Sequence, residues 1–396
     1  MGLWSKLTGA ADRDEFTQQV LARIREELGA AELDATTYSI RFGESTVFLE
    51  GYWQTYRQAH AKRRPAVIDR LVAEAREMID VNSAETFDDV RARLRPMVHD
   101  RIFWSASRLK FRLAKVPSDQ LPHVAPFDAH LTQSVVVDHP TMRRGVTPGD
   151  HEVWGKDLTT LLAVAKGNLE RASHPRWTTE APGVWRLPFD DGYAVSRLLL
   201  PSLFREATGS QQPVALALSA DVVLAATPER AGALATLAEL AAQASDLPKA
   251  MAPLPLVLDG DRWVEYPVAD PAVQSAFEEL RYKFLIDAYE GQQSMLNALE
   301  DDKSFVASYK VMQKKGGPLV SMASLTIGLP TLLPKCDRVV IVKPGPTRED
   351  YKVLCDVPWD AFARIVPLAE EPDLAPARYR TSGALDDAQC QALASA

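Results

Sequence analysis

The fold class of this chain is decided by residues 182–240, PGVWRLPFDDGYAVSRLLLPSLFREATGSQQPVALALSADVVLAATPERAGALATLAEL, and residues 257–268, VLDGDRWVEYPV. In this stretch, two runs of strand-forming residues flank a long helix rich in Ala and Leu. Its polar residues stand mostly where turns and helix caps need them, for example at Asp259 and Gly260. The stretch therefore predicts a compact α+β unit without a recognisable catalytic set.

The chain on either side of this unit is long enough for further domains. Its 396 residues exceed the roughly 250 to 300 at which a single hydrophobic core stops growing. Helical periodicity alternates with strand patterns in the N-terminal two thirds, which predicts layered α/β units, and a small antiparallel β-rich domain follows. We expect an N-terminal α/β unit in residues 1–125, a second in residues 126–270, a helix and β-meander in residues 271–367, and a loosely ordered tail in residues 368–396.

The composition is that of an ordinary soluble globular protein, with 46% hydrophobic and 25% charged residues. A net charge of -8 disfavours a general affinity for nucleic acid or for an anionic membrane, because both need a basic protein surface. Neither a signal peptide nor a membrane-spanning run is expected. The three cysteines, Cys336, Cys355 and Cys390, have no CxxC spacing, so a reducing cytoplasm is the expected location.

A basic segment lies in residues 89–115, where arginines and lysines are interleaved with large apolar residues. One interpretation is an amphipathic segment whose arginine side chains cover apolar surface. The other is a docking surface for an acidic protein partner. The residues that would form such a surface are Arg91, Arg95, Arg101, Trp104 and Arg108.

Histidines and carboxylates are frequent in residues 128–152, on the N-terminal side of the stretch that begins at residue 182. Imidazole and carboxylate groups bind zinc, manganese and iron, provided that the fold brings them together. Their spacing matches no HExxH pattern, so solvated loop residues and helix caps are the other interpretation. The cluster comprises Asp128, His130, Asp138, His139, Asp150, His151 and Glu152, and the metal-ligand candidates among these are His130, Asp138, His139 and His151.

Other catalytic patterns are missing from the sequence. The run from Gly149 to Lys156 has five residues between its glycines where a phosphate-binding loop has four, and Asp157 stands where that loop needs Ser or Thr. No serine lies in a GxSxG nucleophile elbow. We therefore predict no cofactor and leave the catalytic residues unassigned.

The order of several segments also resembles a known family. The segments are EFTQQVLARIREEL, LEGYWQTYR, VIDRLVAEA, VRARLRPMV, VVVDHPTMRRGVTPGD, AKGNLE, SRLLLP, ADVVLAATPE and DGDRWVEY. Over roughly residues 12–268 the chain is similar to the YtpQ-like bacterial proteins, classed as domain of unknown function 1444. The resemblance implies a cytoplasmic α+β protein, and it brings no catalytic residues with it.

These observations favour binding over catalysis. We expect a cytoplasmic protein that acts by binding another macromolecule, an immunity or regulatory protein being one form of this function. The alternative is a metal-dependent hydrolase that uses the cluster from Asp128 to Glu152.

Overall fold

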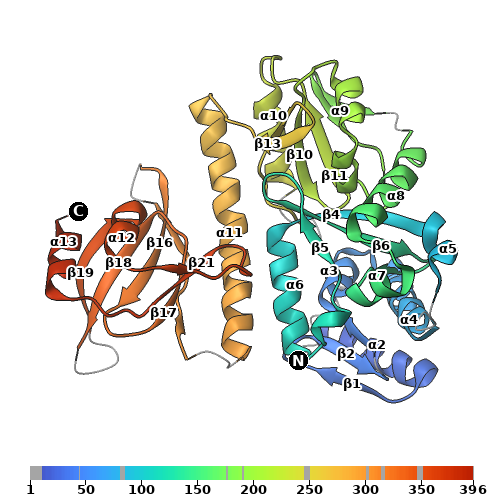
Figure 1. The fold of residues 1–396 in the computed structure, drawn as a ribbon, viewed down its shortest axis with the longest axis horizontal. Helices are drawn as coiled ribbons and strands as arrows, with labels where there is room; N and C mark the ends of the chain where they lie inside the picture. Colours follow the sequence, from blue (N-terminus) through green and yellow to red (C-terminus); the bar gives the residue numbers. More distant parts are fainter. Residues whose placement is uncertain are drawn as a thin grey trace.

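The computed structural model describes residues 11–43, 45–80, 85–174, 177–189, 191–244, 250–299, 303–313, 317–345 and 351–395. Within these residues, helices and small sheets alternate along the chain, and most neighbouring strands are antiparallel (Figure 1). The structure confirms the predicted α+β class.

The N-terminal unit packs three helices against a three-stranded antiparallel sheet of order β1-β2-β3. The first helix begins where the Asp12 carboxylate accepts a hydrogen bond from the backbone N–H of Glu15 (3.0 Å), and it ends at Gly29, whose φ is 94°. Its apolar face packs against Trp53 in one hydrophobic core. The elements are α2 (Arg13–Leu28), β1 (Ala31–Asp34), β2 (Ser39–Phe42), β3 (Ser45–Phe48), α3 (Glu50–Gln58) and α4 (Arg64–Asp80).

The next unit is built on a sheet in which β6 pairs with β4, β5 and β7. The register joins Leu94 to Val137 and Asp100 to Leu131. A domain boundary between residues 125 and 126 is therefore wrong, because it cuts β5 and separates β4 from its partner β6. The elements are α5 (Phe87–Val90), β4 (Leu94–Asp100), α6 (Arg101–Leu113), β5 (Val124–Pro126), β6 (Leu131–Asp138), β7 (Arg143–Gly145), α7 (Pro148–Trp154) and α8 (Leu158–Arg171).

Residues 178–265, which include most of the stretch that decides the fold class, form an antiparallel six-stranded sheet of order β13-β12-β10-β11-β9-β8. All residues of β10 are buried, and α10 packs over β10 and β11 in one core. The turn predicted at Asp259 and Gly260 joins β12 to β13. The elements are β8 (Thr178–Ala181), β9 (Val184–Arg186), α9 (Pro201–Thr208), β10 (Val214–Ser219), β11 (Val222–Ala226), α10 (Ala233–Gln243), β12 (Leu256–Asp259) and β13 (Arg262–Glu265).

The C-terminal part contains one long helix and two four-stranded mixed sheets, ordered β14-β17-β21-β20 and β15-β16-β18-β19. The predicted antiparallel meander is wrong in one respect, since β16 and β18 are parallel neighbours. The reason is that β17, which lies between them in the chain, joins the other sheet. The elements are α11 (Pro271–Leu299), β14 (Phe305–Val306), β15 (Lys310–Gln313), β16 (Leu319–Thr326), β17 (Thr331–Pro334), β18 (Arg338–Pro344), β19 (Tyr351–Pro358) and α12 (Trp359–Ile365).

The predicted loose tail is instead part of this domain. It forms β20 (Ala369–Glu370), β21 (Arg378–Thr381) and α13 (Asp387–Ala394). Strand β21 pairs with β17, and the Arg378 side chain is fully buried. The Arg378 guanidinium donates to the backbone oxygens of Ala307 (2.8 Å) and Leu332 (3.1 Å) and lies over the Tyr289 ring of α11. These contacts fix the tail to the sheet and to the helix.

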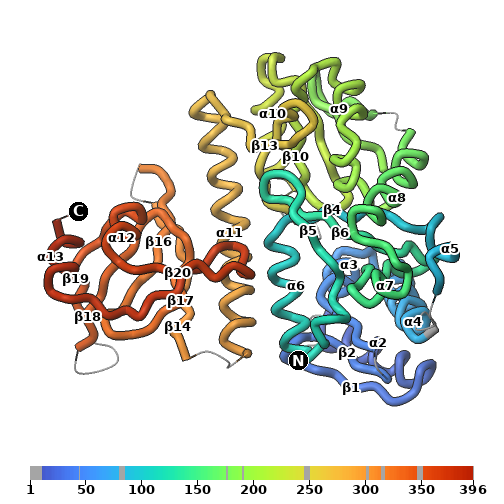
Figure 2. The backbone as a smooth tube through the Cα atoms, viewed as in Figure 1, coloured from blue at the N-terminus to red at the C-terminus, as the bar shows by residue number. Residues whose placement is uncertain are grey.

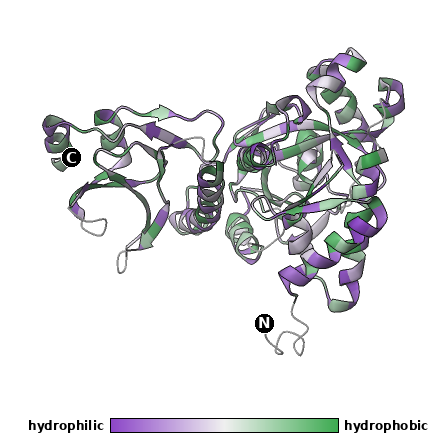
Figure 3. Cartoon of the chain, turned by 90° about the horizontal axis from the view of Figure 1, so that it is seen from below, coloured by the Kyte–Doolittle hydropathy of each residue, from purple (hydrophilic) through white to green (hydrophobic). Residues whose placement is uncertain are grey.

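Helix α11 lies between the C-terminal sheets and the rest of the molecule, and it packs beside α6 and α10 (Figure 2). Seen from below, the C-terminal sheets and the rest of the chain lie on opposite sides of α11 (Figure 3). Among the described residues, no helix has both the length and the apolar composition needed to cross a bilayer.

Candidate functional site

The second half of the predicted basic segment faces the protein's own C-terminal domain. On α6, the hydroxyl of Ser105 donates to the backbone oxygen of Asp373 and accepts from the backbone N–H of Ala375, each at 2.9 Å. The Arg108 guanidinium lies 2.9 Å from the Asp373 carboxylate. Arg101 and Trp104 line the small hollow beside these contacts. This half of the predicted docking surface therefore takes part in an intramolecular contact.

The first half of the segment borders an open hollow of about 560 Å³ between α5 and the end of α8. Arg91 and Arg95 line it as predicted, and Arg171 at the end of α8 joins them. Sequence reasoning missed Arg171, because it follows Arg95 by 76 residues and only the pairing of β4 with β6 and the packing of α8 bring the two together. Arginines from two separate segments therefore converge on one hollow.

The buried side chain of Asn168 connects the two segments that line this hollow. Its Nδ2 donates to the backbone oxygens of Arg91 (2.8 Å) and Leu94 (2.9 Å), and its Oδ1 accepts from the Arg171 guanidinium. Arg95 donates from Nη1 to the backbone oxygens of Ala92 and Leu94, both at 3.0 Å. The arginines are thus partly pre-positioned, which lowers the entropy lost when they bind a ligand.

The three arginines of the hollow have no acidic partner in the part of the chain that the structure describes. No carboxylate oxygen lies within 4.0 Å of their guanidinium nitrogens there. Arg93, between the two arginines of the segment, differs because it pairs with Glu85 at 2.5 Å. Asp88 also lines the hollow, so its rim carries three positive charges and one negative charge. Such a rim suits a carboxylate or phosphate group.

The four predicted metal ligands do not come together. His130 is mostly buried, and burial together with the nearby charge of Arg281 lowers its pKa to about 4. Asp138 accepts a hydrogen bond from the Tyr193 hydroxyl at 2.8 Å. In the described ranges, no group of three or more His, Cys, Asp or Glu residues is arranged to hold a metal ion.

His139 lies in a separate buried cluster of charged groups. Its Nδ1 is 3.1 Å from the Arg93 guanidinium and so accepts a hydrogen bond, since the guanidinium can only donate. Its Nε2 is 3.8 Å from a carboxylate oxygen of Glu85. The pKa of His139 is lowered, chiefly by burial, although Glu85 opposes the shift. The cluster joins β6 to the segment before β4 and has the character of a structural contact.

Three other members of the predicted cluster have structural roles or lie at the surface. The Asp128 carboxylate accepts from the backbone N–H of Trp263 (2.8 Å) and thereby ties the loop before β6 to β13. Asp150 forms a capping box with Thr147 at the start of α7, as the capping interpretation predicts. Glu152 lines a surface hollow together with His151. His151 contacts His123, a residue that the sequence did not single out.

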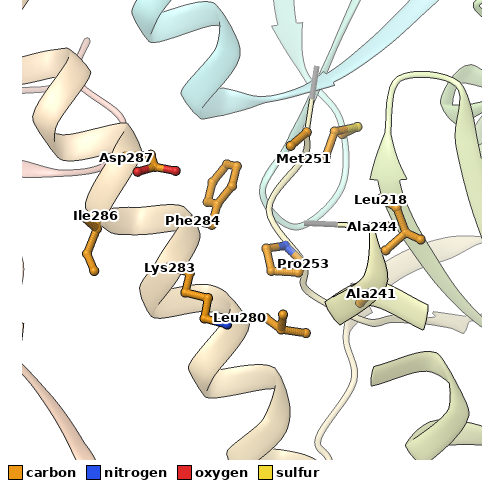
Figure 4. Close-up of a pocket in the computed structure, with 11 residues that line it drawn as sticks. Leu218, Ala241, Ala244, Met251, Pro253, Leu280, Lys283, Phe284, Ile286 and Asp287 are labelled. Carbon is orange, nitrogen blue, oxygen red and sulfur yellow. The ribbon is translucent and has the colours of Figure 1, made fainter. Parts of the chain in front are cut away.

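An apolar pocket of about 350 Å³ lies between α11 and the sheet unit that carries α10. In Figure 4, Leu280 and Phe284 project from α11 toward Pro253 and Met251. The pocket could hold an apolar group, but both of its charged residues, Lys283 and Asp287, are exposed. Residues 245–249, which connect two of its lining residues, lie outside the described residues. We assign this pocket no function.

Comparison with known proteins gives no further information. No family model, no curated protein and no solved structure matches this chain. The resemblance to the YtpQ-like family stays a prediction.

Proposed function

We propose that this protein is a non-catalytic binding protein that recognises an acidic segment of a partner protein through Arg91, Arg95 and Arg171. The observation that supports the proposal is the hollow in which these three arginines lie without an acidic partner among the described residues. Guanidinium groups form bidentate hydrogen bonds with carboxylates and phosphates, which makes arginine the usual residue for such recognition.

The proposal includes a cytoplasmic location and excludes nucleic acid as the general partner. The three cysteines are free thiols, as is usual in a reducing compartment. The chain's net charge of -8 repels a long polyanion at a distance, whereas a short acidic segment interacts mainly with the local charges of the hollow. Regulatory and immunity proteins are two kinds of protein that act in this way. The segment order shared with the YtpQ-like family supports the same cytoplasmic assignment.

The contribution of the arginines can be estimated. Hydrogen bonds to charged groups contribute about 1.5 to 3 kcal/mol each, but exposed ion pairs contribute only about 0 to 1 kcal/mol. For two partly exposed arginines we take about 2 kcal/mol in total, which corresponds to roughly a thirtyfold change in affinity.

A photo-crosslinking amino acid at the exposed position Ala92, which lines the hollow, tests the proposal. In cells that express the chain natively, we expect a covalent adduct whose attached peptide is rich in Asp, Glu or phosphorylated residues. The charge-reversed variant Arg91→Glu/Arg95→Glu should lower the yield of this adduct at least tenfold. The variant Arg91→Lys/Arg95→Lys should retain part of it, because it keeps the charge and loses the bidentate geometry.

A matched control reverses two exposed charges outside the hollow, Arg57→Glu and Lys352→Glu. This control changes the net charge equally and should leave the adduct intact. The proposal is wrong if the charge-reversed hollow gives the same adduct, if the attached peptides are not acidic, or if no adduct forms at Ala92. Equal thermal midpoints for all variants establish that the comparison is made on folded protein.

A further inference from the structure

His123 and His151 face each other although 28 residues separate them in the chain. The Nδ1 atom of His123 lies 3.1 Å from the Nε2 atom of His151, and the two ring planes are inclined at 76°. His123 immediately precedes β5, and His151 lies on α7. The pair therefore depends on how β5 and α7 are held together.

The backbone, and not the imidazole contact, positions the two residues. The backbone N–H of His123 donates to the oxygen of Val146 (2.9 Å), and the capping box of α7 begins at the next residue. Gly145 allows this approach, because a Cβ atom there would lie 2.6 Å from Cγ of Pro122. The imidazoles are thus brought together by packing that does not depend on their own hydrogen bond.

The proton positions on His151 follow from its second contact. Its Nδ1 lies 2.8 Å from the backbone oxygen of Lys156, which can only accept, so Nδ1 carries the proton. The Nε2 lone pair is then directed toward His123. Metal-bound histidines commonly show this arrangement, in which the second ring nitrogen donates to a backbone carbonyl or carboxylate and fixes the ring.

The separation of the two nitrogens matches shared coordination of one ion. Imidazole nitrogens lie about 2.0 to 2.1 Å from zinc. Two such nitrogens are about 2.9 Å apart when they subtend a right angle at the ion and about 3.3 Å apart in a tetrahedron. The observed 3.1 Å lies between these values. For His123 to become the second ligand, its proton must move to Nε2. Both rings must also turn, so that the lone pairs of His123 Nδ1 and His151 Nε2 meet at the ion instead of facing each other.

The surroundings leave room for the other ligands of an ion. The pair borders a surface hollow of about 750 Å³, which is large enough for several water molecules. The carboxylates of Glu152 and Asp157 line the same hollow, and Arg108 opposes them with one positive charge. The local balance therefore favours a cation.

We propose that His123 and His151 together bind one divalent transition-metal ion of the class that prefers imidazole, such as Zn²⁺ or Ni²⁺. Water molecules complete the coordination, and Glu152 and Asp157 attract the ion. This site is separate from the arginine hollow, so the inference does not depend on the proposed function.

Isothermal titration of the metal-free full-length protein with ZnCl₂, and separately with NiCl₂, tests this inference. We expect one metal site per chain, and its affinity should fall at least tenfold in His123→Asn and in His151→Asn. Asparagine keeps hydrogen-bonding capacity but is a poor ligand for these metals. The double variant should bind the metal no more weakly than either single variant does, because a single remaining imidazole cannot form a chelate. The metal should also raise the thermal midpoint of the unmodified protein and not that of the variants.

The variant His60→Asn is the matched control, because His60 is an exposed histidine far from the pair in the sequence. It should bind the metal as the unmodified protein does. Equal binding by all five proteins would show an adventitious site elsewhere and would overturn the inference. An absence of stoichiometric binding by the unmodified protein would overturn it as well. Thermal midpoints measured without metal identify any variant that fails to fold, and His123→Gln or His151→Gln then replaces it.

Discussion

Low pH should decrease the stability of the folded protein through His130, one of the residues that the sequence analysis named as a candidate metal ligand. The His130 side chain is mostly buried, and burial and then the charge of Arg281 on α11 lower its pKa from 6.5 to about 4. Its backbone oxygen accepts a hydrogen bond from the backbone N–H of Arg101 at 2.9 Å, so the loop before β6 is held beside α6. Between pH 6.5 and pH 4, the unfolded chain binds a proton at this position and the folded chain does not.

The direction and size of the effect follow from this difference. The contribution of His130 to stability is fully present above pH 6.5 and is lost progressively as the pH falls toward about 4. The full separation of the two pKa values corresponds to about 3 kcal/mol, of which about 2 kcal/mol is lost by pH 5. Because the side chain keeps some contact with water, we expect a loss of about 1 to 2 kcal/mol at pH 5.

Urea unfolding at pH 7.5 and at pH 5.0 measures this loss in the unmodified protein and in His130→Gln. The free energy of unfolding should fall by about 1 to 2 kcal/mol more in the unmodified protein than in the variant. Other titrating groups contribute equally to both proteins and cancel in the comparison. His60→Gln, which changes an exposed histidine, should behave like the unmodified protein. If His130→Gln loses as much stability as the unmodified protein, within about 0.5 kcal/mol, the reasoning is refuted.

Three further predictions concern the C-terminal domain. Ser105→Ala should lower the free energy of unfolding by about 1 to 3 kcal/mol, because a partly buried backbone N–H and a carbonyl oxygen lose their partner; an unchanged urea midpoint would contradict this. Arg378→Met should lower the free energy of unfolding by about 3 kcal/mol, because three backbone carbonyls and the Gln292 amide oxygen lose their donors. This loss should exceed the desolvation penalty that the substitution relieves. A calorimetric midpoint equal to that of the unmodified protein would show that the penalty cancels those hydrogen bonds. Cys336 should resist iodoacetamide at pH 8 in the folded protein and react in urea, because burial and then Asp337 raise its pKa to about 12; mass spectrometry of the labelled peptides, with Cys355 as the less buried comparison, would reveal native labelling if the idea is wrong.

Local patterns predicted those parts of the fold that depend on neighbouring residues. The turn at Asp259 and the strands that flank the Ala- and Leu-rich helix follow from contacts within a few residues or from short runs of strand-forming residues. The parallel pairing of β16 with β18 was missed, because alternating polarity does not say which strand is the neighbour. The packed tail was missed as well, since its Ala and Pro content hides the few buried residues, which include Arg378, Thr381 and Leu393.

The candidate sites were predicted only in part. Arg91 and Arg95 were identified from the density of basic residues, but nothing in the sequence connected them with Arg171. His151 was identified as one member of a cluster, whereas its partner is His123 and not His130 or His139. Residue type indicated the chemistry in both cases, and the fold selected the members.

The sequence alone determined the class of the fold, most of its local elements and the groups available for binding, because hydrophobic periodicity, caps and turns act over short distances along the chain. The tertiary structure alone decided which charges are neutralised and which remain open. In the basic segment, Arg108 meets Asp373 of the C-terminal domain while Arg91 has no such partner among the described residues. The physical reason is that an ion pair or a histidine pair depends on distance in space, and that distance is set by sheet pairing and helix packing between segments far apart in the sequence.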